Sequence, residues 1–458
     1  MVSGPTGRPA GTRPAPASRR GRFSSSLASR RRRVLSSLVS RRRRFSSSLA
    51  SRHGHLLPLH AHLRGRVLSA VLLAAATSSV GLCALAVLGA FLHEVPYLDL
   101  AGAPVSSARR FVVALSAGGS LALCLWLRRR SRLTAAVLGL AVLTATGASV
   151  ITARMTAAVE RAGADISLVQ SLVHVVGGGS ATPSAPDAEA AYSTYQGRPL
   201  KLSVYRPAGS TTASRAPVLL YVHGGGWVAG SRADRSDDMR WFADRGWLTI
   251  SLDYGLSAED RHLWDVVHGQ IGCALAWVAR NAHRYGGDAA RLSLTGDSAG
   301  GNLAVNTAYM AGNKTLRASC AGPVPAVAAV SVLYPVLDPA GFHRNDDPAS
   351  GEAARRMAEA YTGGSPREFP QRYAAVSAFS HLSGAAPATL VIVGEADRLV
   401  PPEGAYRFAE QARARGVDVE LVRVPHAGHV FDGPAGSIGR QAYRQLTAAW
   451  LRDRGQAP

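Results

Sequence analysis

Three long apolar stretches occupy residues 67–92, 111–127 and 133–152, and none of them contains a charged side chain. A helix needs about 20 such residues to cross the hydrocarbon core of a bilayer. The second stretch is shorter, but arginines flank it on both sides and their long side chains can reach the membrane surface. Arginine clusters between apolar stretches are typical of membrane proteins, so the pattern predicts three transmembrane helices.

Beyond residue 190 the apolar residues fall into short runs rich in Val, Ile and Leu. Runs of this kind predict strands over 200–207, 216–223, 247–254, 291–296, 327–335, 388–395 and 417–425. Helical stretches lie between most of them, as at 264–284 and 402–415, and a last helix is expected over 437–453. Continuous apolar strands are typical of a parallel sheet that is buried on both faces. The alternation predicts an α/β domain with a mostly parallel sheet and an active site at the strands' carboxyl ends.

Between the spans and this domain, residues 153–176 are expected to form a helix that leaves the membrane. Residues 177–190 are rich in Gly, Pro, Ser and Ala and predict a linker. The expected organisation is therefore a tail over 1–66, transmembrane helices over 67–152, a helix and linker over 153–190, and the α/β domain over 191–458.

The tail contains three 11-residue repeats of Ser, Arg and a few apolar residues, beginning at residues 18, 29 and 40. It cannot bury enough apolar surface to offset the entropy of folding, so disorder is expected. Three alternatives stay open for it: a solvated tail, a segment that adheres to anionic lipid headgroups, or an upstream stretch that is not translated.

The net charge of +22 is unevenly distributed along the chain. Residues 1–66 contain sixteen arginines and no acid, whereas the residues from 160 onward are close to neutral. The large C-terminal part thus lacks the basic surface that a nucleic-acid partner requires. Arginine-rich segments stay in the cytoplasm, which predicts a cytoplasmic N-terminus and a cytoplasmic 128–132 loop. With three spans, the 191–458 domain is then expected outside the cytoplasmic membrane.

One serine stands in a G-x-S-x-G pattern after the run at 291–296 and before an expected helix. The glycines at 296 and 300 permit a sharp turn from strand to helix. Such a turn presents the Ser298 hydroxyl above the sheet, beside a helix N-terminus that favours developing negative charge. The setting predicts that Ser298 is a nucleophile.

A serine nucleophile needs donors for the oxyanion that forms when it attacks a carbonyl. Three glycines in the stretch YVHGGGWVAG, at 224–226, end an earlier buried strand and leave the backbone N–H groups accessible. The N–H of Ala299, directly after the nucleophile, would complete the oxyanion hole.

The serine also needs a base, and the base needs an acid that orients it. In hydrolases of this topology the order along the chain is Ser, Asp, His. Asp397 lies just past a buried strand, with Glu395 as its competitor. His426 and His429 follow the last strand, and His429, deeper in the loop, is expected to be the base.

The motifs HGGGW, GDSAGG, GEADRLVPPEGAYRFAEQARARG and HAGHVF occur in this order over residues 192–455. Together they resemble the α/β-hydrolases of the hormone-sensitive-lipase-like carboxylesterase branch and the related feruloyl- and acetyl-esterase-like enzymes. The resemblance implies a structural role for His223 and no metal or cofactor. It also implies the following site: nucleophile Ser298, base His429, orienting acid Asp397, and oxyanion donors Gly224, Gly225 and Ala299.

The chain departs from this family's pattern in two places. The stretch DYGLSAED (253–260) is only loosely similar, and membrane spans with a linker replace the family's N-terminal cap, which bears on substrate selection. The sequence as a whole predicts a membrane-anchored serine carboxylesterase that acts on a small ester or lipid-like substrate. A peptidase or amidase on the same scaffold, and a catalytically silent membrane-binding module, are the alternatives. Cys273 and Cys320 could pair if the domain faces an oxidising compartment, and two free thiols are the alternative.

Overall fold

The computed structural model describes residues 56–95, 97–98, 102, 109–177, 183–209 and 215–458. The chain divides into two units, Met1–Val71 and Leu72–Pro458. Disorder was predicted for the tail over 1–66, and residues 1–55 of it lie outside the described part of the chain. From Leu56 onward the tail is helical, because helix α2 (Leu56–Phe91) begins before the expected span. Its only proline, at position 58, falls in the first turn, where a missing backbone N–H costs nothing.

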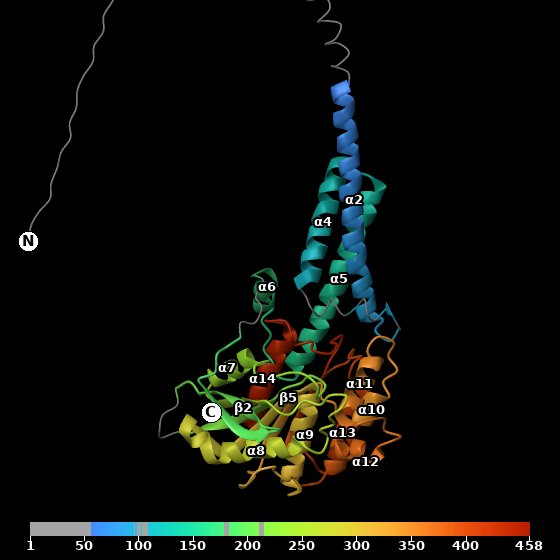
Figure 1. Ribbon diagram of the computed structural model, residues 1–458. Helices are drawn as coiled ribbons and strands as arrows, with labels where there is room; N and C mark the ends of the chain where they lie inside the picture. The colour runs from blue at the N-terminus through green and yellow to red at the C-terminus, as the bar shows by residue number, and fades with distance from the viewer. Residues whose placement is uncertain (1–55, 96, 99–101, 103–108, 178–182, 210–214) are drawn as a thin grey trace, which may run out of the picture. The chain divides into compact units, whose positions relative to one another are not determined.

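Among the described residues, three helices are long and apolar enough to cross a membrane: Arg64–Phe91, Phe111–Arg129 and Arg132–Arg161. They correspond to α2, to α4 (Arg109–Arg129) and to α5 (Arg132–Arg161), and they coincide with the three predicted stretches. Figure 1 shows α4 and α5 side by side.

The helix expected over 153–176 is instead two helices. Helix α5 continues to Arg161, and the separate helix α6 covers Leu168–Gly177. The continuation has a packing reason, because Ile151, Met155 and Val159 recur at helical spacing and are buried in a core cluster. The chain turns at Gly163, whose φ of +101° is favoured by glycine.

One eight-stranded sheet forms the α/β domain, with the strand order β1-β2-β4-β3-β5-β6-β7-β8. Its strands are β1 Ala188–Tyr195, β2 Arg198–Tyr205, β3 Ala216–Val222, β4 Leu248–Leu252, β5 Gly287–Asp297, β6 Ala329–Leu333, β7 Ala388–Gly394 and β8 Val419–Val424. From β4 to β8 all neighbours are parallel, and only the β1–β2 and β2–β4 pairs are antiparallel. The predicted mostly parallel sheet is therefore confirmed.

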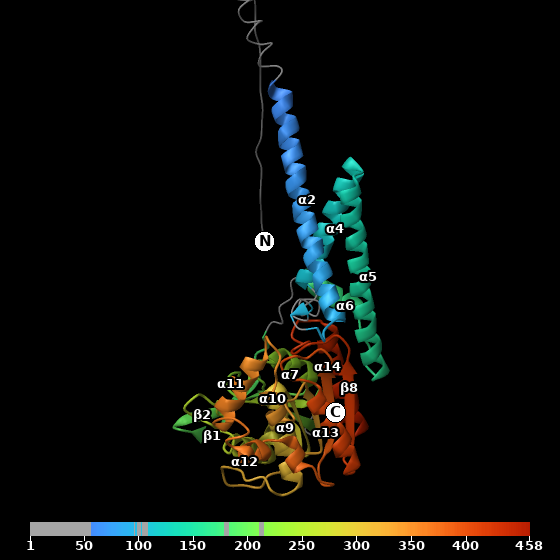
Figure 2. The same cartoon turned by 90° about the vertical axis from the view of Figure 1, so that its right-hand side faces the viewer.

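Helices cover both faces of this sheet, as Figures 1 and 2 show. One core cluster contains residues of α8 (Val267–Asn281), α9 (Ser298–Gly312) and α13 (Glu403–Ala414). The other contains residues of α7 (Ser236–Ala243) and α14 (Ile438–Asp453), together with apolar residues of α2 and α5. The sheet thus separates two layers of helices, and the membrane-type helices pack into one of them.

Two regions escaped the sequence analysis. Strand β1 begins at Ala188, inside the expected linker, and pairs with β2. Its sequence AEAAYSTY has no Val, Ile or Leu, because an edge strand buries little. The second region is an insertion between β6 and β7 with three short helices, α10 (Pro339–His343), α11 (Gly351–Thr362) and α12 (Pro370–Ala375).

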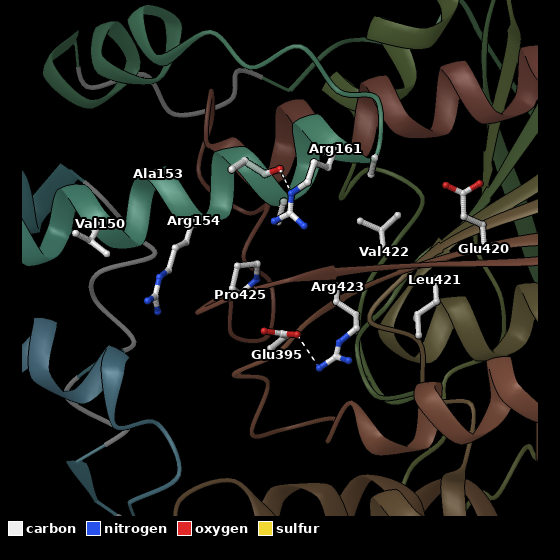
Figure 3. Close-up of a pocket in the computed structure, with 13 residues that line it drawn as sticks. Val150, Ala153, Arg154, Arg161, Glu395, Glu420, Leu421, Val422, Arg423 and Pro425 are labelled. Atoms are coloured by element: carbon white, nitrogen blue, oxygen red, sulfur yellow. Dashed lines mark hydrogen bonds and ion pairs between the residues drawn. The ribbon is translucent and has the colours of Figure 1, made fainter.

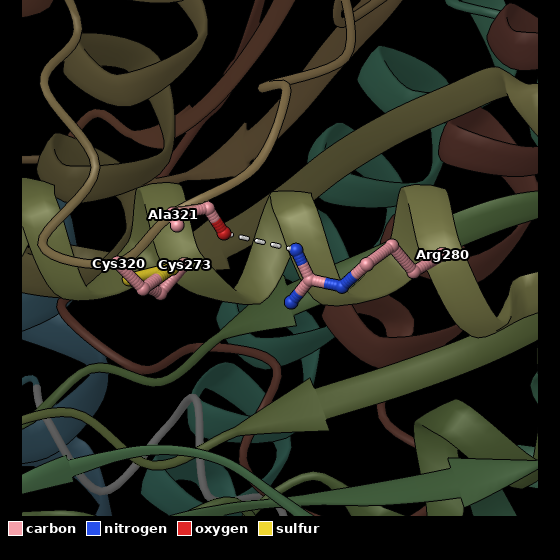
Figure 4. The surroundings of a disulfide bond; sticks show 4 residues. All are labelled: Cys273, Arg280, Cys320 and Ala321. Atoms are coloured by element: carbon pink, nitrogen blue, oxygen red, sulfur yellow. Dashed lines mark hydrogen bonds between the residues drawn. A yellow bond between two sulfur atoms is a disulfide. The ribbon is translucent and has the colours of Figure 1, made fainter.

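A disulfide joins Cys273 of α8 to Cys320, with 5.6 Å between the two Cα atoms (Figure 4). Nearby, Arg280 donates a hydrogen bond of 3.1 Å to the carbonyl of Ala321. The bond closes a loop with a sequence separation of 47 residues, for which loop-closure entropy predicts a stabilisation of about 4 kcal/mol. The sequence left open whether Cys273 and Cys320 are paired or free, and in the structure they are paired.

Candidate active site

Ser298 stands at a sharp turn between β5 and α9. Its φ of +52° is rare for a residue with a side chain. A Cβ atom at position 296 would lie 2.6 Å from the carbonyl oxygen of Gly300, and a Cβ atom at 300 would overlap the carbonyl of Val222. Only glycine fits at both positions, and the turn therefore holds the serine hydroxyl at the carboxyl edge of the sheet.

Three of the predicted residues meet at this edge. His429 Nε2 lies 3.1 Å from Ser298 Oγ, and His429 Nδ1 lies 2.7 Å from Asp397 Oδ2. The other carboxylate oxygen, Asp397 Oδ1, accepts hydrogen bonds of 3.0 and 2.9 Å from the backbone N–H groups of Leu399 and Val400. With both oxygens engaged and the side chain buried, the carboxylate is held in one orientation toward the imidazole.

The competitor Glu395 points elsewhere. It forms an ion pair of 2.8 Å with Arg423 and lines a cavity of about 930 Å³ between α5 and β8. Figure 3 shows the pair in this cavity, whose lining contains none of the residues Ser298, Asp397 or His429.

The other histidine of the HAGH loop also faces another partner. His426 Nδ1 lies 2.9 Å from the carbonyl oxygen of Ala90 in α2, and its ring packs edge-on against Phe91 at 5.3 Å. The backbone at His426 is left-handed, with φ of +58°. The structure brings His429, and not His426, to the serine.

The HGGG loop lies beside Ser298, and its three glycines differ in their partners. The N–H of Gly224 donates a hydrogen bond of 3.3 Å to Asp297 Oδ1. Gly225 and Gly226 have φ values of +109° and +61°, and in the described part of the chain neither amide donates to a protein acceptor. A Cβ atom at Gly226 would lie 2.5 Å from the sulfur of Met357, so α11 lies over this loop.

The predicted structural histidine fits beneath this loop. His223 is buried, its Nδ1 lies 2.7 Å from the carbonyl oxygen of Gly224, and its ring stacks on Tyr254 at 4.1 Å. The hydroxyl of Tyr254 donates a hydrogen bond of 2.9 Å to the His223 carbonyl. Tyr254 belongs to the stretch DYGLSAED, which therefore supports the loop despite its loose similarity to the family.

Asp297, directly before Ser298, is a residue that the sequence analysis missed. Its Oδ1 also accepts a hydrogen bond of 2.6 Å from the hydroxyl of Tyr221, and Oδ2 lies 3.6 Å from Arg235. The carboxylate thereby connects the end of β5 to the end of β3 and holds Gly224 in place. An acid between the glycine and the serine of the motif is the signal that could have revealed it.

Behind the site, Arg235 is buried between acids. It pairs with the buried Asp432 and donates a hydrogen bond of 2.7 Å to the hydroxyl of Tyr334. That hydroxyl donates in turn to Asp432 at 2.6 Å, and the Tyr334 ring lies 4.6 Å from the His429 ring. Burial alone would raise the pKa of Asp432, but Arg235 and Tyr334 lower it and keep the carboxylate charged.

The carboxylates around His429 change its protonation. Burial alone would lower the pKa of His429, but Asp397, together with the more distant Asp297 and Asp432, outweighs burial and raises it. A general base must be neutral to accept a proton. The raised pKa of His429 therefore predicts that activity, as the pH falls, begins to be lost at a pH above the ordinary histidine pKa of about 6.5.

We expect the acid limb of kcat/KM for a neutral ester to have its midpoint above about pH 6.5 in a pH–rate profile. The raised pKa also means that the protonated imidazolium stabilises the fold at low pH and that this contribution is lost as the pH rises through the folded-state pKa. Thermal unfolding measured across the same pH range checks this second expectation. A midpoint below pH 6 would contradict the proposed effect of the carboxylates.

Comparison with known proteins assigns the fold to one class. Residues 202–411 match the BD-FAE family model. The chain is 34% identical over 253 residues to the ethyl acetate hydrolase of Pseudomonas putida. The matched region covers 52% of this chain and 73% of that protein. It is 30% identical to Esterase LipQ of Mycobacterium tuberculosis, over 52% of this chain and 55% of that protein.

Among solved structures, esterase 2 of Thermogutta terrifontis phosphonylated by sarin is 26% identical with a TM-score of 0.52. The match covers 60% of this chain and 98% of that one. The chain spans about half the length of three of its mycobacterial relatives, LipQ, LipM and LipC. The chain belongs to the α/β-hydrolase family of carboxylic ester hydrolases.

Proposed function

We propose that the protein is a membrane-anchored serine carboxylesterase. The observation that carries the proposal is the pair of distances from His429, 3.1 Å to Ser298 Oγ and 2.7 Å to Asp397 Oδ2. This is the geometry that a nucleophile, a general base and an orienting acid require. The esterases among its relatives support a carboxylic ester as the substrate, and the order of the motifs supports the hormone-sensitive-lipase-like branch.

In the proposed reaction, His429 accepts the proton of Ser298 as Oγ attacks the ester carbonyl. The backbone N–H groups of Gly225 and Ala299 stabilise the oxyanion, and that of Gly226 joins them, since Gly224 donates to Asp297 instead. The imidazolium then protonates the leaving alcohol. A water molecule, deprotonated by the same histidine, hydrolyses the acyl-enzyme and restores the serine.

A fluorophosphonate probe tests this proposal, because it reacts covalently with an activated serine. We expect labelling of the wild-type protein at Ser298, and turnover of an aryl ester that exceeds turnover of the matched anilide. Faster turnover of the anilide would favour the peptidase or amidase alternative. The absence of both labelling and turnover in folded protein would favour the catalytically silent module.

We further propose that the three apolar helices cross the cytoplasmic membrane with the N-terminus inside, which places the α/β domain outside. The arginine clusters at 30–33, 41–44 and 128–132 support this orientation. The Cys273–Cys320 disulfide also supports it, because such bonds persist in oxidising compartments. The proposed organisation keeps a tail over 1–66, spans over 67–152, a connecting segment over 153–190 and the hydrolase over 191–458.

Protease added to intact cells with a permeabilised outer envelope tests the orientation. We expect digestion of the 191–458 domain and protection of the N-terminal tail, as detected with an antibody against each part. Digestion of the tail with protection of the domain would show that the orientation is reversed.

A further inference from the structure

Helix α6 exposes an apolar face. Leu168, Val169, Leu172 and Val173 recur at positions i, i+1, i+4 and i+5, so they share one side of the helix. All four are between 49 and 73% exposed. A contiguous exposed apolar face beside predicted membrane spans is typical of a helix that lies in the membrane interface.

The opposite side of α6 is fixed to the hydrolase. The hydroxyl of Ser171 donates a hydrogen bond of 2.8 Å to the Gly436 carbonyl and accepts one of 2.9 Å from Gln441 Nε2 in α14. The segment before α6 is held in the same way, since Gln445 and the backbone of Asp165 exchange two hydrogen bonds of 2.6 Å. The direction of the apolar face is therefore set by the fold.

A cavity of about 480 Å³ lies between α6, α7 and α14. Its basic lining residues are Arg240, Arg245, Arg440, Arg444 and His174. The acids that line it are Asp237 and Asp244. Asp237 pairs with Arg440 and Arg444, Asp238 pairs with Arg444, and Asp187 pairs with Arg240, so these three arginines are compensated. Arg245 is the arginine of this cavity for which the described residues provide no ion pair.

Arg245 is the most available of these cations. It is exposed, its guanidinium stacks on Trp241 at 3.7 Å, and it donates a hydrogen bond of 3.1 Å to the carbonyl of the same residue. Burial and the neighbouring Arg444 and Arg452 lower the pKa of Arg245, and Asp244 opposes them.

The cavity and the apolar face lie on the side of the domain from which α5 leaves. Figures 1 and 2 both show α6, α7 and α14 on that side, and α6 contacts α4. Helix α5, with 30 residues, is about 45 Å long and exceeds the hydrocarbon thickness of about 30 Å by several turns. Its last turns can therefore stand in the interface, at the level of α6.

We propose that α6 and the arginine-lined cavity beside it form a docking surface for anionic phospholipid headgroups of the membrane. The apolar face enters the boundary of the acyl chains, and Arg245 binds the lipid phosphate. This inference rests on the membrane location proposed above. Docking of this kind would hold the hydrolase in a fixed orientation against the bilayer.

The depth of α6 can be measured on the full chain in nanodiscs that contain phosphatidylglycerol. The environment-sensitive dye NBD is attached to Val169→Cys in a Cys124→Ser background, since Cys83 is buried and the other two cysteines are paired. We expect blue-shifted emission that lipid-borne spin labels quench. The control Arg415→Cys, at the end of α13, is expected to report water. Emission from position 169 that matches position 415 would overturn the proposal.

The headgroup site is tested by titrating the full chain, in uncharged detergent, with short-chain phosphatidylglycerol. We expect Arg245→Gln to weaken binding about fivefold, the factor that corresponds to roughly 1 kcal/mol per basic residue near a lipid surface. Arg245→Lys should restore most of the affinity, because it keeps the charge. Arg415→Gln, which removes another exposed arginine bonded only within its own helix, should bind like the wild type.

Three outcomes separate the alternatives. Equal binding by wild type and Arg245→Gln overturns the headgroup site, and inorganic phosphate that binds as tightly as the lipid shows an anion site without a lipid function. A blue shift at position 169 that disappears on dilution assigns the face to a second copy of the chain. Flotation with liposomes tests the membrane location itself, so a protein that floats but keeps position 169 in water contradicts only this inference.

Discussion

Replacement of Ser298 or His429 by alanine is expected to lower kcat for a simple aryl ester at least about a thousandfold. The two residues act as a unit, because the hydroxyl is a weak nucleophile until the imidazole removes its proton, and loss of either abolishes the same step. Both variants should therefore fall to a similar residual rate. Steady-state kinetics, with circular dichroism to verify folding, provide the measurement.

The matched control is His426→Ala, three residues away in the same loop. His426 bonds to the carbonyl oxygen of Ala90 and does not reach Ser298, so this variant should keep most of its activity. An inactive His426→Ala together with an active His429→Ala would show that the base assignment is wrong while the esterase proposal survives. Full activity of Ser298→Ala would refute the mechanism itself.

The second large effect is expected from Asp397→Asn, with a loss of about 10⁴-fold in kcat, as in other Ser-His-Asp hydrolases. Asp397 Oδ1 accepts the N–H groups of Leu399 and Val400. In the variant, the asparagine carbonyl would keep these bonds and its NH₂ group would face His429 Nδ1. The imidazole would then carry its proton on Nε2, where it cannot accept the proton of Ser298.

Glu395→Gln serves as the control for this prediction. Its side chain pairs with Arg423 in the cavity beside α5, so the variant should change kcat by less than about threefold. An equally inactive Glu395→Gln would indicate that the carboxylate assignment is incomplete. NMR of the imidazole nitrogens distinguishes a tautomer change in Asp397→Asn from a loss of structure.

Most of the architecture could be predicted from the sequence, because it depends on local patterns. The apolar stretches predicted the three long helices, and the Val/Ile/Leu runs predicted strands β2 to β8. The regions that escaped have weak local signals. Strand β1 has no Val, Ile or Leu because it lies at an edge, and α10 to α12 are short helices, of which α11 packs over the HGGG loop.

The residue types that follow each strand could be read from the sequence, and they gave the candidates Ser298, Asp397 and His429. The sequence favoured His429 over His426 and Asp397 over Glu395, but the contacts that separate these neighbours involve residues far apart along the chain. Glu395 turns to Arg423, His426 to Ala90, and the Gly224 amide to Asp297. These contacts join β7 to β8, the last loop to α2, and β3 to β5, and only the tertiary structure brings those segments together.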